Sequence, residues 1–265
     1  MVMCRLFIPI ILLLLLGCGD RFEYSPNQTF DRDSPYHLNQ HNLKKLHTQS
    51  HDDTVVIAFI GDSQRFYDEV KQFVQKVNAS DEYDFILIAG DISDFGLLQE
   101  LEWVNDKLKY LKRPYFTVIG NHDVVGNGNA TFEYFFGPIN YSFSYGDYTF
   151  ILHNTNGREY LGNQVPDLNW LHQQLHDVST PYTIGVSHVP PFDGDFNKKL
   201  ELTYAALLKS QSNFLVSLHG HQHRFSDGDP YRDGVRYITA PHFELRSFVK
   251  LTLIGKKVMV EKIPF

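Results

Sequence analysis

Short apolar runs alternate with amphipathic stretches along the chain beyond residue 54. The runs at residues 55–60, 85–89 and 114–119 are rich in β-branched and aromatic side chains and predict buried strands. Between them, residues 66–77 and 97–111 carry apolar side chains at helical spacing. Continuous apolar strands separated by helices indicate a largely buried sheet with right-handed crossovers, whose strand ends gather loops at one edge.

The pattern changes in the second half of the chain. Residues 141–145 and 148–152 alternate around Gly146 and Asp147, which predicts a β-hairpin. A helix is predicted at residues 166–177, with Pro166 at its start. Two apolar strands that lead into histidines are predicted at residues 182–187 and 214–218, and closing antiparallel strands at 235–239, 248–253 and 258–262. The whole pattern predicts two sheets packed face to face and flanked by helices.

The N-terminal region has the features of a targeting segment followed by a tether. Arg5 precedes an apolar run of the length of a signal-peptide core, shorter than the roughly 20 residues that span a membrane. Leu15-Leu16-Gly17-Cys18 resembles a bacterial lipobox, so residues 1–17 are expected to be a lipoprotein signal peptide and Cys18 to carry lipid. A plain signal peptide or a short uncleaved anchor is the alternative.

The expected lipid would hold the protein on the extracytoplasmic side of a bacterial membrane, in the cell envelope. Residues 18–52 are polar and show no sustained periodicity, so they predict a membrane tether with a short helix near residues 38–46. The folded domain is then expected to occupy residues 53–265. Cys4 would leave with the signal peptide and Cys18 would be lipidated, which leaves no thiol for a disulfide or a thiolate metal site.

Composition narrows the choice of function. The 265 residues are 43% hydrophobic, enough for one large domain with a sizeable core. The formal net charge of −7 argues against broad binding to nucleic acid, because a phosphate backbone needs a basic face.

Polar residues with metal-binding side chains follow the predicted strands. They are Asp62, Asp91, Asn121, His188, His221 and His223. One histidine after a strand is more often structural than a ligand, but six such residues at strand ends can converge at one edge of the fold. Oxygen and imidazole donors without thiolates suit Mn, Fe(II), Zn or Mg rather than a structural zinc site.

Five segments, in order, resemble the motifs of calcineurin-like metallophosphoesterases. They are Gly61-Asp62-Ser63-Gln64, Gly90-Asp91-Ile92-Ser93-Asp94, Gly120-Asn121-His122-Asp123, Ser187-His188 and Gly220-His221-Gln222-His223. The resemblance implies an α/β fold, a four-layer α/β/β/α sandwich of two mixed β-sheets flanked by helices. It also implies a dinuclear-metal enzyme that hydrolyses a phosphomonoester or a phosphodiester.

The resemblance further assigns roles to individual residues. Asp91 would bridge two divalent metal ions. The first site would be completed by Asp62, Gln64 and His223, and the second by Asn121, His188 and His221. His122 matches the residue that stabilises the phosphoryl group or protonates the leaving alkoxide, and Asp94 matches the carboxylate that orients it and raises its pKa. An N-cap of the following helix is the alternative role for Asp94.

Two departures from the family pattern affect function. Gln64 stands where most of the family has His, and an amide oxygen is a weaker, harder ligand, so the first site is expected to be the weaker one and to favour Mn or Mg. Phe95 stands where protein Ser/Thr phosphatases have Arg, which argues against that activity. Gln64 also motivates the alternative function, a non-catalytic scaffold or interaction module that keeps the fold, whereas His122 and Asp94 argue for an enzyme.

Three further features have two interpretations each. Arg65 either meets a substrate phosphate or is a solvated residue before a helix. The loop at residues 190–195 either lines the substrate cleft or is a stiff exposed connection. His242 either faces the pocket or has a structural role.

Overall fold

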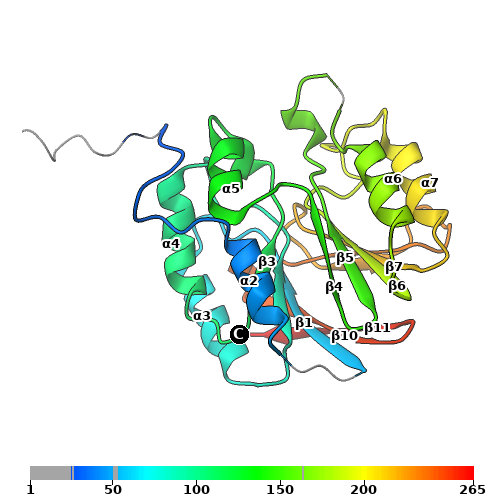
Figure 1. The fold of residues 1–265 in the computed structure, drawn as a ribbon, viewed down its shortest axis with the longest axis horizontal. Helices are drawn as coiled ribbons and strands as arrows, with labels where there is room; N and C mark the ends of the chain where they lie inside the picture. Colours follow the sequence, from blue (N-terminus) through cyan, green and yellow to red (C-terminus); the bar gives the residue numbers. More distant parts are fainter. Residues whose placement is uncertain (1–24, 26, 50–52, 163) are drawn as a thin grey trace, which may run out of the picture.

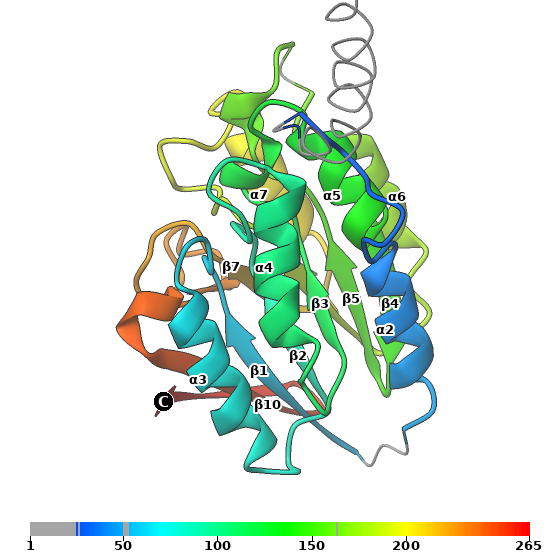
Figure 2. The same ribbon diagram turned by 90° about the vertical axis from the view of Figure 1, so that its left-hand side faces the viewer.

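Two mixed β-sheets pack face to face, with helices on both outer faces (Figures 1 and 2). This computed structural model describes residues 25, 27–49, 53–162 and 164–265. Helices α3, α4 and α5 cover the first sheet, and α6 and α7 cover the second. The predicted four-layer α/β/β/α sandwich is therefore confirmed.

The first sheet has the strand order β11-β10-β1-β2-β3. Strands β1, β2 and β3 are parallel, as expected for strands joined by helical crossovers, while β10 and β11 add an antiparallel edge. The bounds are β1 (Thr54–Ile60), α3 (Tyr67–Asn78), β2 (Phe85–Ile88), α4 (Leu98–Leu108), β3 (Tyr115–Thr117), α5 (Gly128–Phe136), β10 (Ser247–Ile254) and β11 (Lys257–Pro264).

The second sheet has the order β4-β5-β6-β7-β9-β8. The predicted hairpin is confirmed, since β4 and β5 pair in antiparallel fashion around residues 146–147. The bounds are β4 (Tyr141–Tyr145), β5 (Tyr148–Leu152), α6 (Leu168–His176), β6 (Tyr182–Val186), α7 (Glu201–Lys209), β7 (Phe214–His219), β8 (Ser226–Gly228) and β9 (Arg236–Thr239).

Two local predictions in this half are wrong. Strand β9 runs parallel to β7 and is antiparallel only to the short β8, because the chain turns back through β8 before entering β9. Helix α6 begins at Leu168 rather than at Pro166. The Asp167 side chain caps it by accepting hydrogen bonds from the amides of Asn169 (3.1 Å) and Trp170 (3.0 Å).

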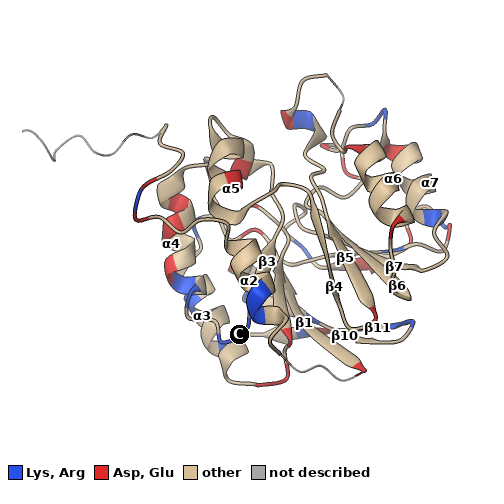
Figure 3. Ribbon diagram, viewed as in Figure 1, with Lys and Arg blue, Asp and Glu red and all other residues tan. Residues whose placement is uncertain are grey.

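The main core lies between the two sheets and is densely aromatic. The Phe85 ring lies 5.2–5.9 Å from four other rings, those of Phe116, Phe143, Tyr145 and Phe150, all in edge-to-face geometry. Charged side chains lie mainly on the outer helices and the connections, and the middles of the sheets carry few of them (Figure 3). Burial on both faces explains why the strands are almost continuously apolar.

Helix α2 (Leu38–Leu46) forms where a short helix was predicted, but it is part of the domain. The Leu46 side chain is 0% exposed and belongs to the core between the sheets. The Asn42 amide donates to the Tyr115 carbonyl at 2.8 Å, and Asn39 exchanges two hydrogen bonds with the Thr117 main chain. The predicted tether of residues 18–52 is therefore wrong for this stretch, and the folded unit begins before residue 38.

The packing of helix α2 into the domain was missed because two of its three buried residues are asparagines that hydrogen-bond to the open edge of β3. The predicted signal peptide and Cys18 lie outside the described residues. Among the residues that the structure does describe, no helix combines the length and apolar character needed to cross a bilayer.

Replacing Leu46 by Ala is expected to lower the free energy of unfolding by about 2–5 kcal/mol, because the change opens a cavity in the main core. The matched control is Leu202→Ala in α7, where the side chain is 74% exposed and the loss should stay within about 0.5 kcal/mol. Urea unfolding of both variants measures the difference. Equal stability of the two variants would show that α2 does not belong to the cooperative unit.

Candidate metal centre

The predicted ligands meet where strands of both sheets end. Asp62 follows β1, Asp91 follows β2 and Asn121 follows β3, while His188 follows β6 and the segment with His221 and His223 follows β7. Because the strands of each set are parallel, their carboxyl ends lie at the same edge of the sandwich.

Four of these side chains surround one position, the expected second site. The His188 Nε2 atom lies 3.2 Å from Asp91 Oδ2 and 3.0 Å from Asn121 Oδ1. His221 Nδ1 lies 2.9 Å from the same Asn121 oxygen. Asp91 and His188 are buried, so these donors are fixed by the fold rather than selected from mobile surface side chains.

The donors of the expected first site also lie close to Asp91. His223 Nε2 is 3.4 Å from Asp62 Oδ1, and the Gln64 amide nitrogen is 3.4 Å from Asp91 Oδ2. The Asp62 Oδ2 atom is buried and has no hydrogen-bond partner within the described part of the chain. Gln64 is 3% exposed, and a flip of its amide would turn an oxygen donor toward the same carboxylates.

Backbone strain concentrates at these residues. Positive φ angles occur at eight described non-glycine residues, and five of them are predicted ligands: Asp62, Gln64, Asp91, His221 and His223. The left-handed conformation is unfavourable for such residues, and its clustering marks a functional site. The strain aims side chains from successive strand ends toward a common centre.

The glycines before the ligands permit this close approach. A Cβ atom on Gly120 would lie 2.1 Å from Asp91 Oδ1 and 2.2 Å from its amide nitrogen. Gly90 has a φ of +84°, and a Cβ there would lie 2.8 Å from His188 Nδ1. Two motif glycines are thus required for packing the ligand loops together.

The charges at the centre favour a bound cation. Burial alone would lower the pKa of His188, but the adjacent Asp91 carboxylate raises it to about 9. The pKa of Asp91 is lowered because the His188 charge outweighs burial of the carboxylate. A divalent cation would replace the proton shared by this pair, and the mixture of carboxylate, amide and imidazole donors fits Mn, Fe(II), Zn or Mg.

His122 stands beside the ligands but is not one of the converging donors. Its amide donates to Asp91 Oδ1 at 2.9 Å, and its Nδ1 lies 2.9 Å from the main-chain carbonyl oxygen of Asp94. A carbonyl oxygen only accepts hydrogen bonds, so Nδ1 carries a proton. Nε2 is then the ring nitrogen that can act on a substrate. The side chain is 40% exposed, as a residue that meets substrate should be.

The Asp94 carboxylate lies near His122, as predicted, but does not hydrogen-bond to it. Its Oδ1 is 4.0 Å from His122 Nδ1, beyond hydrogen-bond distance, and its Oδ2 pairs with Arg65 Nε at 3.3 Å. Asp94 is not an N-cap either, because α4 begins after Leu97. The hydrogen bond between Asp94 and His122 thus runs through the Asp94 main chain, and the solvated Arg65 side chain, 67% exposed, pairs with the Asp94 carboxylate.

Asp123 is a functional residue that the sequence analysis did not single out. Its carboxylate accepts hydrogen bonds from the amides of Ile92, Ser93 and Gly120 and from the Ser93 hydroxyl. Burial and the Asp91 charge raise the pKa of Asp123 to about 6. It ties the loops after β2 and β3 together, and its position in Gly-Asn-His-Asp was the available signal.

Two further elements form walls of the centre. The His242 ring stacks on His223 with 4.8 Å between centroids and 14° between planes, so this residue touches a predicted ligand. The loop at residues 190–195 also reaches the centre, because Asp193 Oδ1 and Asp195 Oδ2 each lie 3.5 Å from His221 Nε2.

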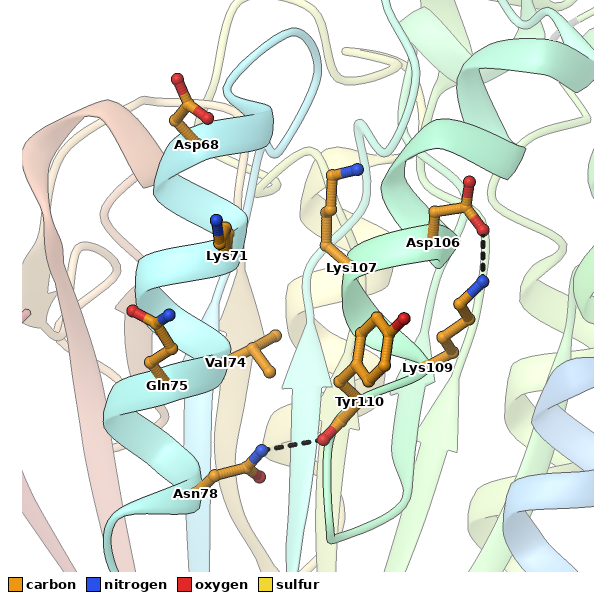
Figure 4. Close-up of a pocket in the computed structure, with 9 residues that line it drawn as sticks. All are labelled: Asp68, Lys71, Val74, Gln75, Asn78, Asp106, Lys107, Lys109 and Tyr110. Atoms are coloured by element: carbon orange, nitrogen blue, oxygen red, sulfur yellow. Dashed lines mark hydrogen bonds and ion pairs between the residues drawn. The ribbon is translucent and has the colours of Figure 1, made fainter.

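A separate groove of about 600 Å³ lies between α3 and α4 (Figure 4). Charged and amide side chains line it, among them Lys71 and Lys107, and Asn78 donates to the Tyr110 carbonyl at its end. No predicted ligand is among its lining residues. The groove is therefore distinct from the candidate centre.

Comparison with known proteins shows the family to which the chain belongs. A sequence model of the calcineurin-like phosphoesterase family matches residues 55–225. That span contains all five motifs and most of the folded domain, so the chain belongs to the calcineurin-like phosphoesterase family.

Curated relatives are phosphodiesterases by description. A probable glycerophosphodiester phosphodiesterase of Arcobacter nitrofigilis is 26% identical over 160 residues, which cover 54% of this chain and 58% of that protein. A probable cyclic nucleotide phosphodiesterase of Xenorhabdus bovienii is 29% identical over 65 residues, 24% of this chain and 26% of the relative. The chain thus matches little more than half the length of one relative and a quarter of the other.

Solved structures share the fold at low identity. A dimetal phosphatase from Danio rerio superimposes with a TM-score of 0.62 at 16% identity, covering 80% of this chain and 99% of that one. A purple acid phosphatase from yellow lupin gives a TM-score of 0.63 at 14% identity, covering 82% of this chain and 52% of the lupin chain. These structural similarities establish the fold. The substrate class has to be inferred from the residues of the site.

Proposed function

We propose that this protein is a dinuclear-metal phosphoesterase that hydrolyses a phosphodiester or a phosphomonoester, with His122 as general acid. The observation that carries the proposal is the convergence of seven donor residues from five strand ends, with His122 beside the central Asp91. They are Asp62, Gln64, Asp91, Asn121, His188, His221 and His223.

A pair of divalent cations at this centre would supply an activated water at neutral pH and would neutralise charge on the phosphoryl oxygens. The Asp91 carboxylate contacts a donor of each expected site, His188 and Gln64, and would help to hold both cations. When its ring carries protons on both nitrogens, His122, held through Nδ1 by the Asp94 carbonyl, can deliver the Nε2 proton to the leaving oxygen. Among the residues that the structure describes, no carboxylate lies within hydrogen-bond distance of the ring, the Asp94 carboxylate being 4.0 Å from Nδ1.

A phosphodiester is the preferred substrate class. Both curated relatives are described as phosphodiesterases, and Phe95 occupies the place of the Arg that protein Ser/Thr phosphatases carry. The test is hydrolysis of bis(4-nitrophenyl) phosphate and 4-nitrophenyl phosphate by the detergent-solubilised full-length protein with Mn²⁺. We expect activity with the diester that EDTA removes and Mn²⁺ restores.

The competing function is a scaffold that keeps the fold without turnover. Gln64 motivates it, but the burial of Gln64 among the other donors supports a ligand role. Absence of hydrolysis of either ester with Mn²⁺, Fe²⁺, Zn²⁺ or Mg²⁺ in a correctly folded preparation would favour the scaffold.

Replacing Gln64 by His is expected to tighten binding of Zn²⁺ at the first site, because imidazole is a better ligand than an amide for borderline metals. Isothermal calorimetry of the metal-free protein measures the change. Gln75→His in the groove on α3 is the control and should leave both affinities unaltered. An unchanged affinity in Gln64→His would place Gln64 outside the first coordination sphere.

Cys18 is proposed to anchor the protein to the extracytoplasmic face of a bacterial membrane through its lipid, following the lipobox-like sequence before it. Replacing Cys18 by Ala is expected to move the protein from the membrane fraction to the soluble fraction, because alanine has no thiol to carry the lipid. Fractionation with immunoblotting measures the shift. Unchanged membrane association would favour an uncleaved anchor.

A further inference from the structure

His221 presents its two ring nitrogens to different partners. Nδ1 lies 2.9 Å from Asn121 Oδ1 and so faces the expected second cation. Nε2 faces the opposite way, where Asp193 Oδ1 and Asp195 Oδ2 each lie 3.5 Å from it. An imidazole that ligates a metal through one nitrogen carries its proton on the other, and a carboxylate near that proton fixes the tautomer and the ring orientation.

The other second-site histidine is held differently. His188 presents Nε2 to Asp91 and Asn121, while its Nδ1 lies 2.5 Å from the main-chain carbonyl oxygen of Ala89. Its orientation therefore follows from the main chain of the residue that directly succeeds strand β2. His221 has no such main-chain acceptor at Nε2 among the described contacts, and the loop of residues 190–195 supplies carboxylates in its place.

Asp193 is itself fixed in position. Its Oδ2 accepts a hydrogen bond from the Gln222 side chain at 3.0 Å, and its Oδ1 accepts one from the Asp195 amide at 3.0 Å. Gln222 lies between the two ligand histidines of the last motif, so the ligand segment and the supporting loop hold each other. Asp195 is bound in addition by Arg158, which links the support to the loop after β5.

We propose that Asp193, assisted by Asp195, is a positioning residue that holds His221 with Nδ1 toward the second cation. The inference rests on the proposed function, because it concerns a ligand of the proposed metal pair. It also assigns a role to Gln222, the third residue of Gly220-His221-Gln222-His223. The Gln222 side chain donates a hydrogen bond that keeps the Asp193 carboxylate in place.

The test is calorimetric titration of metal-free, detergent-solubilised full-length protein with Mn²⁺. The wild type is expected to bind two equivalents. Asp193→Ala should weaken one equivalent by about 10–100-fold, the range for loss of a partner to a ligating histidine. Asp193→Asn should restore part of that loss, because its amide oxygen can still accept a hydrogen bond from Nε2.

The weakened equivalent must be the second site. Gln64→Ala is expected to weaken the other equivalent, so the double variant should weaken both. The matched control is Asp177→Ala, which removes an exposed carboxylate 3.0 Å from His176 Nδ1 and should alter neither affinity. Urea unfolding of metal-free Asp193→Ala should stay cooperative, with a loss no larger than its two hydrogen bonds to Gln222 and Asp195 explain, because the effect on metal affinity acts through the bound cation.

Four results would overturn the inference, and they separate it from the proposed function. Two wild-type equivalents with unchanged affinities in Asp193→Ala would reject the positioning role and leave the metal pair standing. Failure of the wild type to bind two equivalents would reject both. A third equivalent lost in Asp193→Ala would make the loop a separate cation site. Loss of metal-free stability with equal weakening of both equivalents would make Asp193 merely structural.

Discussion

Replacing Asp91 by Asn is expected to remove hydrolysis almost completely, with kcat/KM falling by more than about 10⁴-fold toward the uncatalysed rate. Asp91 lies at the middle of the centre, with His188 Nε2 at 3.2 Å from one oxygen and the His122 amide at 2.9 Å from the other. An amide keeps the shape but loses the charge that two cations would share. Both metal equivalents should therefore be weakened together.

The measurement combines kcat/KM for the diester with metal content after dialysis. Asp68→Asn on the exposed side of α3 is the matched control, and it should retain full activity and both metals. A variant at Asp91 that keeps two tightly bound metals would contradict the bridging role.

Replacing His122 by Ala is expected to keep both metals and to lower kcat by about 10²–10⁴-fold, the usual contribution of a general acid. The His122 ring touches the Asp94 carbonyl rather than the ligand side chains, so its removal should leave the donors in place. The loss should be larger for an alkyl diester than for a 4-nitrophenyl ester, because 4-nitrophenolate departs without needing a proton.

Kinetics with both leaving groups, together with metal analysis, measure this prediction. The control is His176→Ala at the exposed end of α6. Loss of a metal in His122→Ala would make His122 a ligand, and an equal fall for both leaving groups would exclude proton donation as its task.

The strands and the positions of the candidate ligands at strand ends were predictable because they leave strong local signals. Buried parallel strands produce apolar runs, and the candidate ligands come just after such runs, as Asp62 follows β1 and His188 follows β6. The sheet edge then brings them together without any information about distant contacts.

The errors have a common physical origin in contacts that a local pattern does not contain. Helix α2 packs partly through Asn39 and Asn42, whose side-chain amides hydrogen-bond to the edge strand β3. In a sequence, asparagines are expected at the surface, so this packing was not predicted. The direction of β9 depends on the turn through β8. The motif pointed to the Asp94 carboxylate as the partner of His122, whereas the hydrogen bond is to the Asp94 main-chain carbonyl and the carboxylate lies 4.0 Å from Nδ1.

Asp193 and Asp123 illustrate the same limit within the site. Each acts on a residue far away in the sequence, Asp193 on His221 and Asp123 on the loop after β2. Their carboxylates could be noticed in the sequence, but their partners could not, because a side chain's hydrogen bonds depend on tertiary structure.

The most direct test of the proposed metal pair is a crystal structure of the Mn²⁺-loaded protein with anomalous scattering recorded at the manganese edge. Two peaks are expected about 3.5–4 Å apart on either side of the Asp91 carboxylate. One peak should contact Asp62, Gln64 and His223, and the other Asn121, His188 and His221 Nδ1. A single peak, or a peak held by Asp193 and Asp195 with none beside Asp91, would contradict it.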